Sequence, residues 1–127
     1  ELGMSKSLFD ELGVLQSELF RSVRLVVDTG LHYKRWTREE AMDYMKKTTG
    51  MSDAEVVSEI ERYIVWPGQA CSYKVGMIKI LDLRERAKDQ MADSFDIRDF
   101  HSAVLDHGEP PLFVIENLVD DMIKEVN

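Results

Sequence analysis

The chain has 127 residues, 44% of them hydrophobic and 31% charged, which is enough for one domain with a buried core. Its net charge of −8 argues against a nucleic-acid groove, which needs a basic surface, and its single cysteine, Cys71, excludes an internal disulfide. No apolar run approaches the roughly 20 residues of a membrane span, and no signal peptide is visible, so we expect a soluble protein with no nucleic-acid partner.

The first predicted helix is amphipathic, covers Leu8 to Val26 and stops near Gly30, since glycine tolerates the left-handed conformation after a helix end. Its apolar residues recur three or four positions apart: Leu8, Leu12, Leu15, Leu19, Val23 and Val26. Arg24 and Asp28 are charged residues in this otherwise apolar segment. Because a buried charge needs a partner, we expect them to pair with one another or with groups elsewhere.

Two capping boxes mark the starts of the next two helices, because a hydroxyl and a carboxylate three residues apart can each satisfy a free backbone N–H. These pairs are Thr37 with Glu40 and Ser52 with Glu55. The second helix should reach about Lys47, with Gly50 closing the segment, and the third should end at Pro67-Gly68. The apolar face of the third helix should consist of Val56, Ile60, Tyr63 and Ile64.

Three further helices are expected in the second half of the chain. The fourth should be apolar first and polar over residues 84–93, with inward side chains from Val75, Ile78, Ile80, Leu81 and Leu83. Asp96 should cap the fifth helix, which should end near Gly108. Its inward side chains should be Ile97, Phe100, Val104 and Leu105. Pro110 and Pro111 should introduce the sixth, with Ile115, Leu118, Val119, Met122 and Ile123 inward. Since no segment alternates with a period of two, the sequence predicts a single all-α domain of about six helices over residues 1–127.

The segment from Arg62 to Gly76 is the most unusual part of the chain. Pro67-Gly68 interrupts a helical pattern, and polar residues then recur on one helical face, at Gln69 and Tyr73 with Lys74 beside them. Such a break is either a plain turn between helices or the wall of a binding site. His32, just after Gly30, is either a surface histidine or a ligand.

Several kinds of catalytic site lack their motif in this sequence. No H-E-x-x-H pair surrounds His32, His101 or His107, and one cysteine cannot build a thiolate zinc site. There is no serine-hydrolase elbow and no phosphate-binding or dinucleotide-binding glycine loop. We therefore expect no metal ligands and no cofactor in this chain.

Two long blocks resemble a known family. Residues 18–32 followed by 36–41 resemble the R-L-V-V-D-T-G-L-H…W-[ST]-R-E-[EQ]-A block of the bacterial domain-of-unknown-function 885 family. Residues 62–76 match its R-Y-x-x-x-P-G-Q-A-x-[SA]-Y-K-x-G block, and residues 95–101 resemble its F-D-L-R-x-F-H segment. The resemblance covers essentially the whole chain, in order.

This resemblance implies a relation to gluzincin zinc metallopeptidases, which are helical hydrolases. Full-length members carry an H-E-x-x-P-G-H zinc motif and a downstream F-x-E-G-W-A helix, and neither occurs here. The chain therefore resembles the C-terminal portion of a larger helical metallopeptidase-like fold, with zinc expected in the full-length parent and no activity expected from this chain alone. The parent would be cytoplasmic, or exported with its signal absent here.

The resemblance also implies roles for individual residues. In the related peptidases a tyrosine on a late glycine-containing segment stabilises the oxyanion, and Tyr73 has the matching setting. The implied substrate-binding residues are Arg62, Arg24 or Lys74 for a carboxylate, Gln69 for substrate backbone, and His32 as a further donor.

Three hypotheses follow from the sequence. The first is the substrate-side region of a zinc-dependent peptidase or other amide or ester hydrolase, with a peptide-like substrate and the missing N-terminal part of the parent as partner. The second is a non-catalytic helical protein-interaction module whose Arg62–Lys74 corner binds another protein. The third is a stable proteolytic core without a function of its own. An apolar face on the first helix should be exposed and could support self-association.

Overall fold

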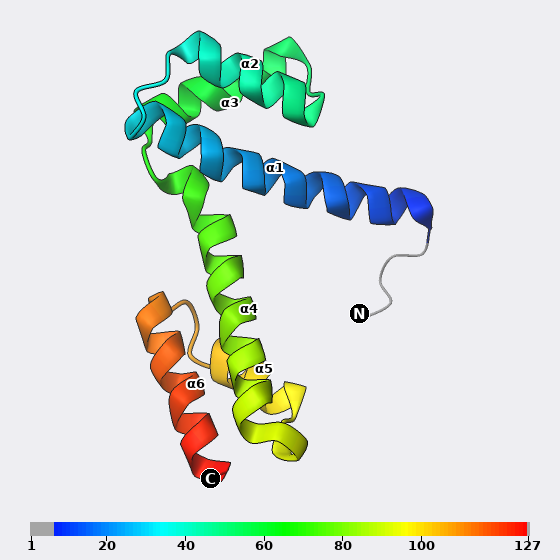
Figure 1. Cartoon of the computed structure of the whole chain (residues 1–127), viewed down its shortest axis with the longest axis vertical. Coiled ribbons are helices and arrows are strands. Elements are labelled where there is room, and N and C mark those ends of the chain that lie inside the picture. Colours follow the sequence, from blue (N-terminus) through cyan, green and yellow to red (C-terminus); the bar gives the residue numbers. More distant parts are fainter. Residues whose placement is uncertain (1–6, 127) are drawn as a thin grey trace. The chain divides into compact units, whose positions relative to one another are not determined.

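The computed structural model describes residues 7–126, and in this part of the chain it contains six α-helices, two short 3-10 helices and no strand (Figure 1). The elements are α1 (Leu8–His32), α2 (Arg38–Thr49), α3 (Asp53–Val65), η1 (Gln69–Cys71), α4 (Ser72–Met91), η2 (Ala92–Ser94), α5 (Ile97–Leu105) and α6 (Leu112–Val126). This confirms the prediction of an all-α chain with about six helices. No helix in the described part is long and apolar enough to cross a membrane.

The chain forms two compact units, Glu1–Val75 and Gly76–Asn127. The prediction of a single domain over residues 1–127 stays a prediction, since compact units of this size can unfold together. The first unit contains α1, α2, α3 and η1, and α2 and α3 lie on the C-terminal half of α1 (Figure 1).

The helix starts in the first unit follow from local capping. Both predicted capping boxes are present, with the Thr37 and Ser52 hydroxyls accepting from backbone N–H groups and the carboxylates of Glu40 and Glu55 accepting in return. Gly50 closes α2 with a left-handed φ of 70°. Because each box uses only residues three apart, the sequence alone was enough to find it.

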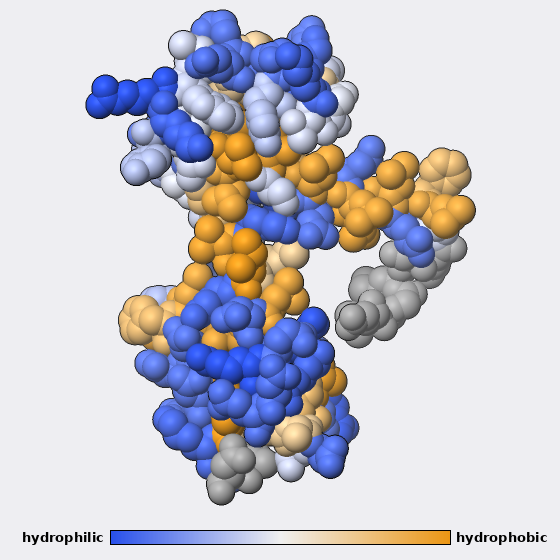
Figure 2. Space-filling view, viewed as in Figure 1, coloured by the Kyte–Doolittle hydropathy of each residue, from blue (hydrophilic) through white to orange (hydrophobic). Residues whose placement is uncertain are grey.

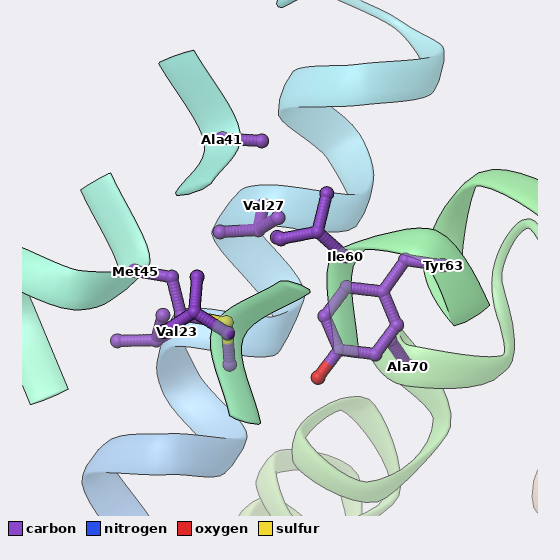
Figure 3. Packing of buried hydrophobic residues seen from close by; sticks show 8 residues of the cluster. Val23, Val27, Ala41, Met45, Ile60, Tyr63 and Ala70 are labelled. Carbon is purple, nitrogen blue, oxygen red and sulfur yellow. The ribbon is translucent and has the colours of Figure 1, made fainter. Parts of the chain in front are cut away.

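The core of the first unit lies between α1, α2, α3 and η1 (Figure 3). Its buried members are Val23, Val27, Ala41, Met45, Val56, Ile60, Tyr63 and Ala70. Ile64, predicted to face inward, is instead exposed, because Tyr63 and Ile60 take the side of α3 that meets α1.

Gly30 does not end the first helix, so that prediction was wrong. The helix continues to His32, and Gly30 is buried inside it. A Cβ atom on Gly30 would lie 2.6 Å from Cδ2 of Trp36, whose ring covers this position. Glycine is therefore needed here for the close approach of an indole ring and not for a turn.

The apolar stripe of α1 is largely exposed, as predicted, and most of it does not pack in this unit. Val23 is buried, but the other members of the stripe are exposed: Leu8, Leu12, Leu15, Leu19 and Val26. The packed face is rotated from the stripe and includes Val27, Arg24 and Asp28.

The second unit has its own core, formed by Leu83, Ala87, Met91, Phe100, Ile115, Val119 and Ile123. The predicted caps of the last two helices hold, since Asp96 caps α5 and α6 begins directly after Pro111. Five inward predictions for α4 and α5 were wrong, since these side chains are exposed: Val75, Ile78, Leu81, Ile97 and Leu105. On α4 the buried face is instead set by Leu83, Ala87 and Met91 at spacings of four.

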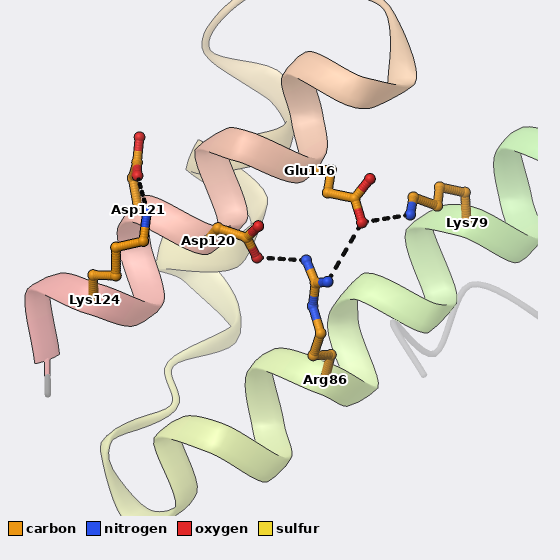
Figure 4. A network of polar contacts seen from close by, with 6 residues as sticks. All are labelled: Lys79, Arg86, Glu116, Asp120, Asp121 and Lys124. Atoms are coloured by element: carbon orange, nitrogen blue, oxygen red, sulfur yellow. Dashed lines mark hydrogen bonds and ion pairs between the residues drawn. The ribbon is translucent and has the colours of Figure 1, made fainter.

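Ion pairs join α4 to α6 in this unit (Figure 4). Glu116 lies 2.7 Å from Lys79 Nζ and 3.4 Å from Arg86 Nη1, and Arg86 Nη2 lies 2.5 Å from Asp120. All four side chains are partly exposed, so the network fixes the two helices more than it adds stability.

Candidate functional site

The turn at Pro67-Gly68 is held by a buried carboxylate from α1. Gly68 has a φ of 83°, a left-handed conformation that glycine adopts without strain. Its backbone N–H donates to both carboxylate oxygens of Asp28, at 3.1 and 3.0 Å. Asp28 is only 4% exposed, so this charged residue is buried in order to fix the turn.

Arg24, one helical turn before Asp28, reaches the segment after the turn. Its Nη2 donates to Oε1 of Gln69 at 2.9 Å, and its guanidinium lies over three aromatic rings. The distances from Cζ to the ring centroids are 4.7 Å for Tyr73 and 5.6 Å for both Tyr63 and Phe20. Arg24 and Asp28 thus bind groups elsewhere, which was one of the two predicted alternatives.

The environment of Arg24 is unusually dry for a cation. The side chain is 6% exposed, and its buried Nε has no hydrogen-bond partner among the described residues. Aromatic faces compensate a desolvated guanidinium in part, by about 2 kcal/mol for a well-placed ring. The site therefore contains a cation with an unused donor.

A second arginine converges on the same amide oxygen. Arg62 Nη1 donates to Oε1 of Gln69 at 3.2 Å, and its Nη2 lies 2.5 Å from Oε2 of Glu59. The Tyr63 hydroxyl donates to that same carboxylate oxygen at 2.5 Å. The hydrogen bond that Arg62 donates to Glu59 raises the pKa of Arg62. Burial, and then the hydrogen bond to Glu59, raise the pKa of Tyr63 far above its usual value of 10.

Tyr73 is the candidate residue with the freest polar group. The side chain is 49% exposed, and its hydroxyl makes no hydrogen bond to any described residue. Arg24 lies over its ring at 4.7 Å, and Arg21 lies 5.6 Å from the ring centroid. The phenol is therefore held by its ring while the hydroxyl remains available.

Lys74 and His32 already have partners in this structure. Lys74 Nζ lies 2.9 Å from a carboxylate oxygen of Glu18 on α1. His32 Nε2 lies 2.9 Å from the Tyr63 carbonyl oxygen, which can only accept, so this nitrogen carries the proton. Both side chains secure the corner to α1.

Cys71 lies on η1 and is half-buried beside Asp28. Burial raises the pKa of its thiol, and the negative charge of Asp28 and a hydrogen bond to it raise this pKa further. An unreactive thiol of this kind reports on its surroundings and is a poor nucleophile.

A surface hollow of about 420 Å³ adjoins these residues within the first unit. It is lined by Phe20, Met51, Ala54, Glu55, Ser58 and Glu59. Phe20 is one of the rings under Arg24, and Glu59 binds Arg62, so the hollow shares two residues with the surroundings of the arginines.

The chemistry available here is that of binding and hydrogen-bond donation. Two guanidiniums, one amide and one phenol are gathered on one corner, which suits a carboxylate or a polarised carbonyl oxygen. Among the described residues, no group of three histidines, cysteines or acids could hold a metal ion. Within residues 7–126, the side chains therefore offer no ligand set for a zinc ion.

The structure brings together four of the six residues that the sequence pointed to: Arg24, Arg62, Gln69 and Tyr73. Glu59 and the hydroxyl of Tyr63 were missed. The positions of Glu59, Arg62 and Tyr63 at i, i+3 and i+4 contained that signal, since such residues are neighbours on a helix.

Three comparisons place these residues among known proteins. The model of a family described as "Bacterial protein of unknown function (DUF885)" matches residues 1–119. A crystal structure of "the putative lipoprotein from Colwellia psychrerythraea" is 54% identical, with a TM-score of 0.94 over 98% of this chain. The chain covers 21% of that solved chain, about a fifth of its length. No curated protein matches the chain.

Proposed function

The chain belongs to the DUF885 family of bacterial proteins, and we propose that it forms the substrate-side, C-terminal region of a zinc-dependent peptidase or related amide or ester hydrolase. On this proposal the chain is inactive alone, because its described residues offer no zinc site. The metal and the attacking water would belong to another part of a longer protein. A solved relative about five times as long is consistent with such a parent.

The observation that carries the proposal is the half-exposed Tyr73 phenol beside two converging arginines. When a nucleophile adds to a carbonyl, the oxygen becomes negative, and a positioned hydroxyl stabilises it. Tyr73 would donate this hydrogen bond, and the nearby guanidinium of Arg24 would add positive potential.

Arg62 and Gln69 would position the substrate. Arg62 lies at the surface end of the cluster and can exchange its bond to Glu59 for a substrate carboxylate. The Gln69 carbonyl is held by both arginines, which leaves its NH₂ group to donate to substrate backbone. Lys74 and His32 would be further donors to the substrate. Lys74 would first have to release Glu18, and His32 would have to release the Tyr63 carbonyl oxygen.

The test is steady-state kinetics of a full-length parent with a peptide or ester substrate. Tyr73→Phe should lower kcat by about 100-fold with little change in KM, because the hydroxyl acts only on the developing oxyanion. Arg62→Ala should raise KM more than it lowers kcat, because the carboxylate is charged throughout the reaction. Tyr33→Phe is the matched control, since Tyr33 is exposed and lies outside the cluster.

A different result would remove Tyr73 from the reaction. If Tyr73→Phe lowers thermal stability while turnover per folded molecule stays at the level of Tyr33→Phe, the phenol only packs against Arg24. A parent without a bound metal and without hydrolytic activity would overturn the proposal as a whole.

The alternative, a protein-interaction module, is favoured by one observation. Ile64, Val65 and Trp66 are three consecutive exposed apolar residues directly before Pro67. On this alternative, Trp66→Ala would abolish binding of a partner protein, whereas Tyr73→Phe would leave it unchanged. The lipoprotein description of the solved relative supports an exported parent, which fractionation of cells that express the full-length protein would test.

A further inference from the structure

The first half of α1 presents a continuous row of uncovered apolar side chains. Leu8, Leu12, Leu15 and Leu19 follow one another at spacings of four, three and four, and Val26 continues the row. All five are exposed in the structure. Figure 2 shows this helix as a band of hydrophobic surface. We call these five residues the α1 seam.

The spacing of the α1 seam is that of a helix–helix contact. Apolar residues at alternating spacings of three and four lie on one edge of a helix, where a second helix can pack along its length. The core of the first unit uses this edge only at Val23, because it otherwise packs against the rotated face that contains Val27 and Arg24. The seam is thus a second, independent packing face on the same helix.

A hollow at one end of the seam has room for a partner's side chain. It measures about 410 Å³ and is lined by Gln16, Ser17, Leu19, Phe20, Thr49 and the neighbouring Gly50 and Met51. Leu19 belongs both to this hollow and to the α1 seam. A helix lying on the seam could therefore insert a side chain between α1 and the α2–α3 connection.

We infer that the α1 seam is covered by an amphipathic helix from another part of a longer polypeptide. The solved relative keeps nearly the same backbone over this chain while being about five times as long, so a longer protein of this kind has further chain to supply such a helix. This inference rests on the proposed function only in assuming a longer parent.

Charge favours such a partner over a second copy of this chain. Glu11 and Glu18 flank the seam on one side, with Glu18 already paired to Lys74, and the whole chain has a net charge of −8. A second copy would add the same acidic flank and the same net charge, whereas a helix with lysine or arginine along one edge would complement it.

The experiment measures thiol accessibility at two adjacent positions of α1. Leu15→Cys lies on the seam, and Val14→Cys is the matched control, because Val14 is 60% exposed against 63% for Leu15 but points to another side of the helix. Both variants carry Cys71→Ser, so that no other thiol reacts. Each is made in this chain and at the aligned positions of the full-length Colwellia relative.

In this chain both cysteines should react with a maleimide at similar rates. In the full-length relative, reaction at the Leu15 position should slow by about 100-fold while the Val14 position changes little, since only a covered site must open before it reacts. Protection at both positions, or at neither, would overturn the inference. Protection of Leu15 already in this chain, rising with its concentration, would instead identify a second copy as the occupant. None of these results depends on hydrolytic activity, so failure of the inference is distinguishable from failure of the proposed function.

Discussion

Removal of the Asp28 carboxylate should loosen the Pro67-Gly68 turn and destabilise the first unit. Asp28 is buried, and both of its oxygens accept from the Gly68 N–H. Asp28→Ala deletes this acceptor, and no other group from α1 bonds to the Gly68 N–H in the described structure. The turn, with its φ of 83°, would then be held to α1 by the bond between Gln69 and Arg24, and locally by the Cys71 N–H, which donates to the Gly68 carbonyl.

The size of the effect can be worked out from two contributions. A hydrogen bond to a charged group contributes about 1.5–3 kcal/mol. Alanine regains about 0.5 kcal/mol because it favours a helix more than aspartate does. The net loss for Asp28→Ala should therefore be about 1–2 kcal/mol, and Asp28→Asn, which keeps an oxygen but not the charge, should lose about 1 kcal/mol.

Urea unfolding followed by tryptophan fluorescence measures this loss. The chain has two tryptophans, Trp36 and Trp66, and both lie in the first unit, so the signal reports on that unit. With an m-value of about 1–2 kcal/mol/M, the midpoint for Asp28→Ala should fall by about 1 M. Thr29→Ala is the control, because this adjacent residue is exposed and its hydroxyl bonds only within α1.

Cys71 provides a second measurement on the same variants. Burial, and then the charge and hydrogen bond of Asp28, raise the pKa of its thiol. Asp28→Asn should therefore lower this pKa and shift the pH dependence of labelling downward. A loss of stability below about 0.5 kcal/mol together with an unchanged labelling profile would show that Asp28 does not hold the corner.

Two further predictions concern stability. Gly13→Ala should stabilise the chain by about 1 kcal/mol, because Gly13 lies in α1 with nothing within 4 Å of an added Cβ. Gly30→Ala should instead destabilise the chain by about 1–2 kcal/mol, because the added Cβ would overlap the Trp36 ring. Thermal melts give the two signs, and equal shifts would contradict the packing at Gly30. The Arg98 side chain and backbone N–H lower the pKa of Asp96 to about 2 from 3.8. The contribution of Asp96 to capping α5 is therefore complete above about pH 4 and lost as the pH falls through about 2. Amide exchange in α5 should be faster in Asp96→Ala than in the unsubstituted chain at pH 6, and this difference should shrink toward pH 2. A difference that stays constant with pH would show that ionisation of Asp96 does not stabilise α5.

Local signals allowed most helix boundaries to be predicted from the sequence. Capping boxes and the Pro67-Gly68 break each depend on residues a few positions apart, so their physical cause is contained in the sequence window that shows them. Gly30 shows the limit of this reasoning. Glycine marks a helix end or a close approach equally well, and only the position of Trp36 distinguishes the two.

The candidate site was predicted in part for a similar reason. Arg24 and Asp28 were recognisable because charges interrupt an apolar segment, but their partners lie 45 and 40 residues away at Gln69 and Gly68. Such contacts follow from the packing of α1 against η1, which no local pattern encodes. Glu59 has the composition of an ordinary surface acid, and its role depends on which side of α3 meets α1.

The buried charges and the exposed leucines of α1 have a common physical basis. A helix that packs on one side needs one apolar face, whereas α1 has charged residues on the side it buries and leucines on the side it exposes. Burying Arg24 and Asp28 costs desolvation energy that only the corner around Gln69 and Gly68 offsets. Exposing a row of leucines has no such compensation within this unit. A helix with both features is best understood as shared between two layers, one that builds the candidate site and one that covers the α1 seam. Substitutions on the seam should therefore leave the corner intact in this chain and affect it only where a longer protein packs on α1.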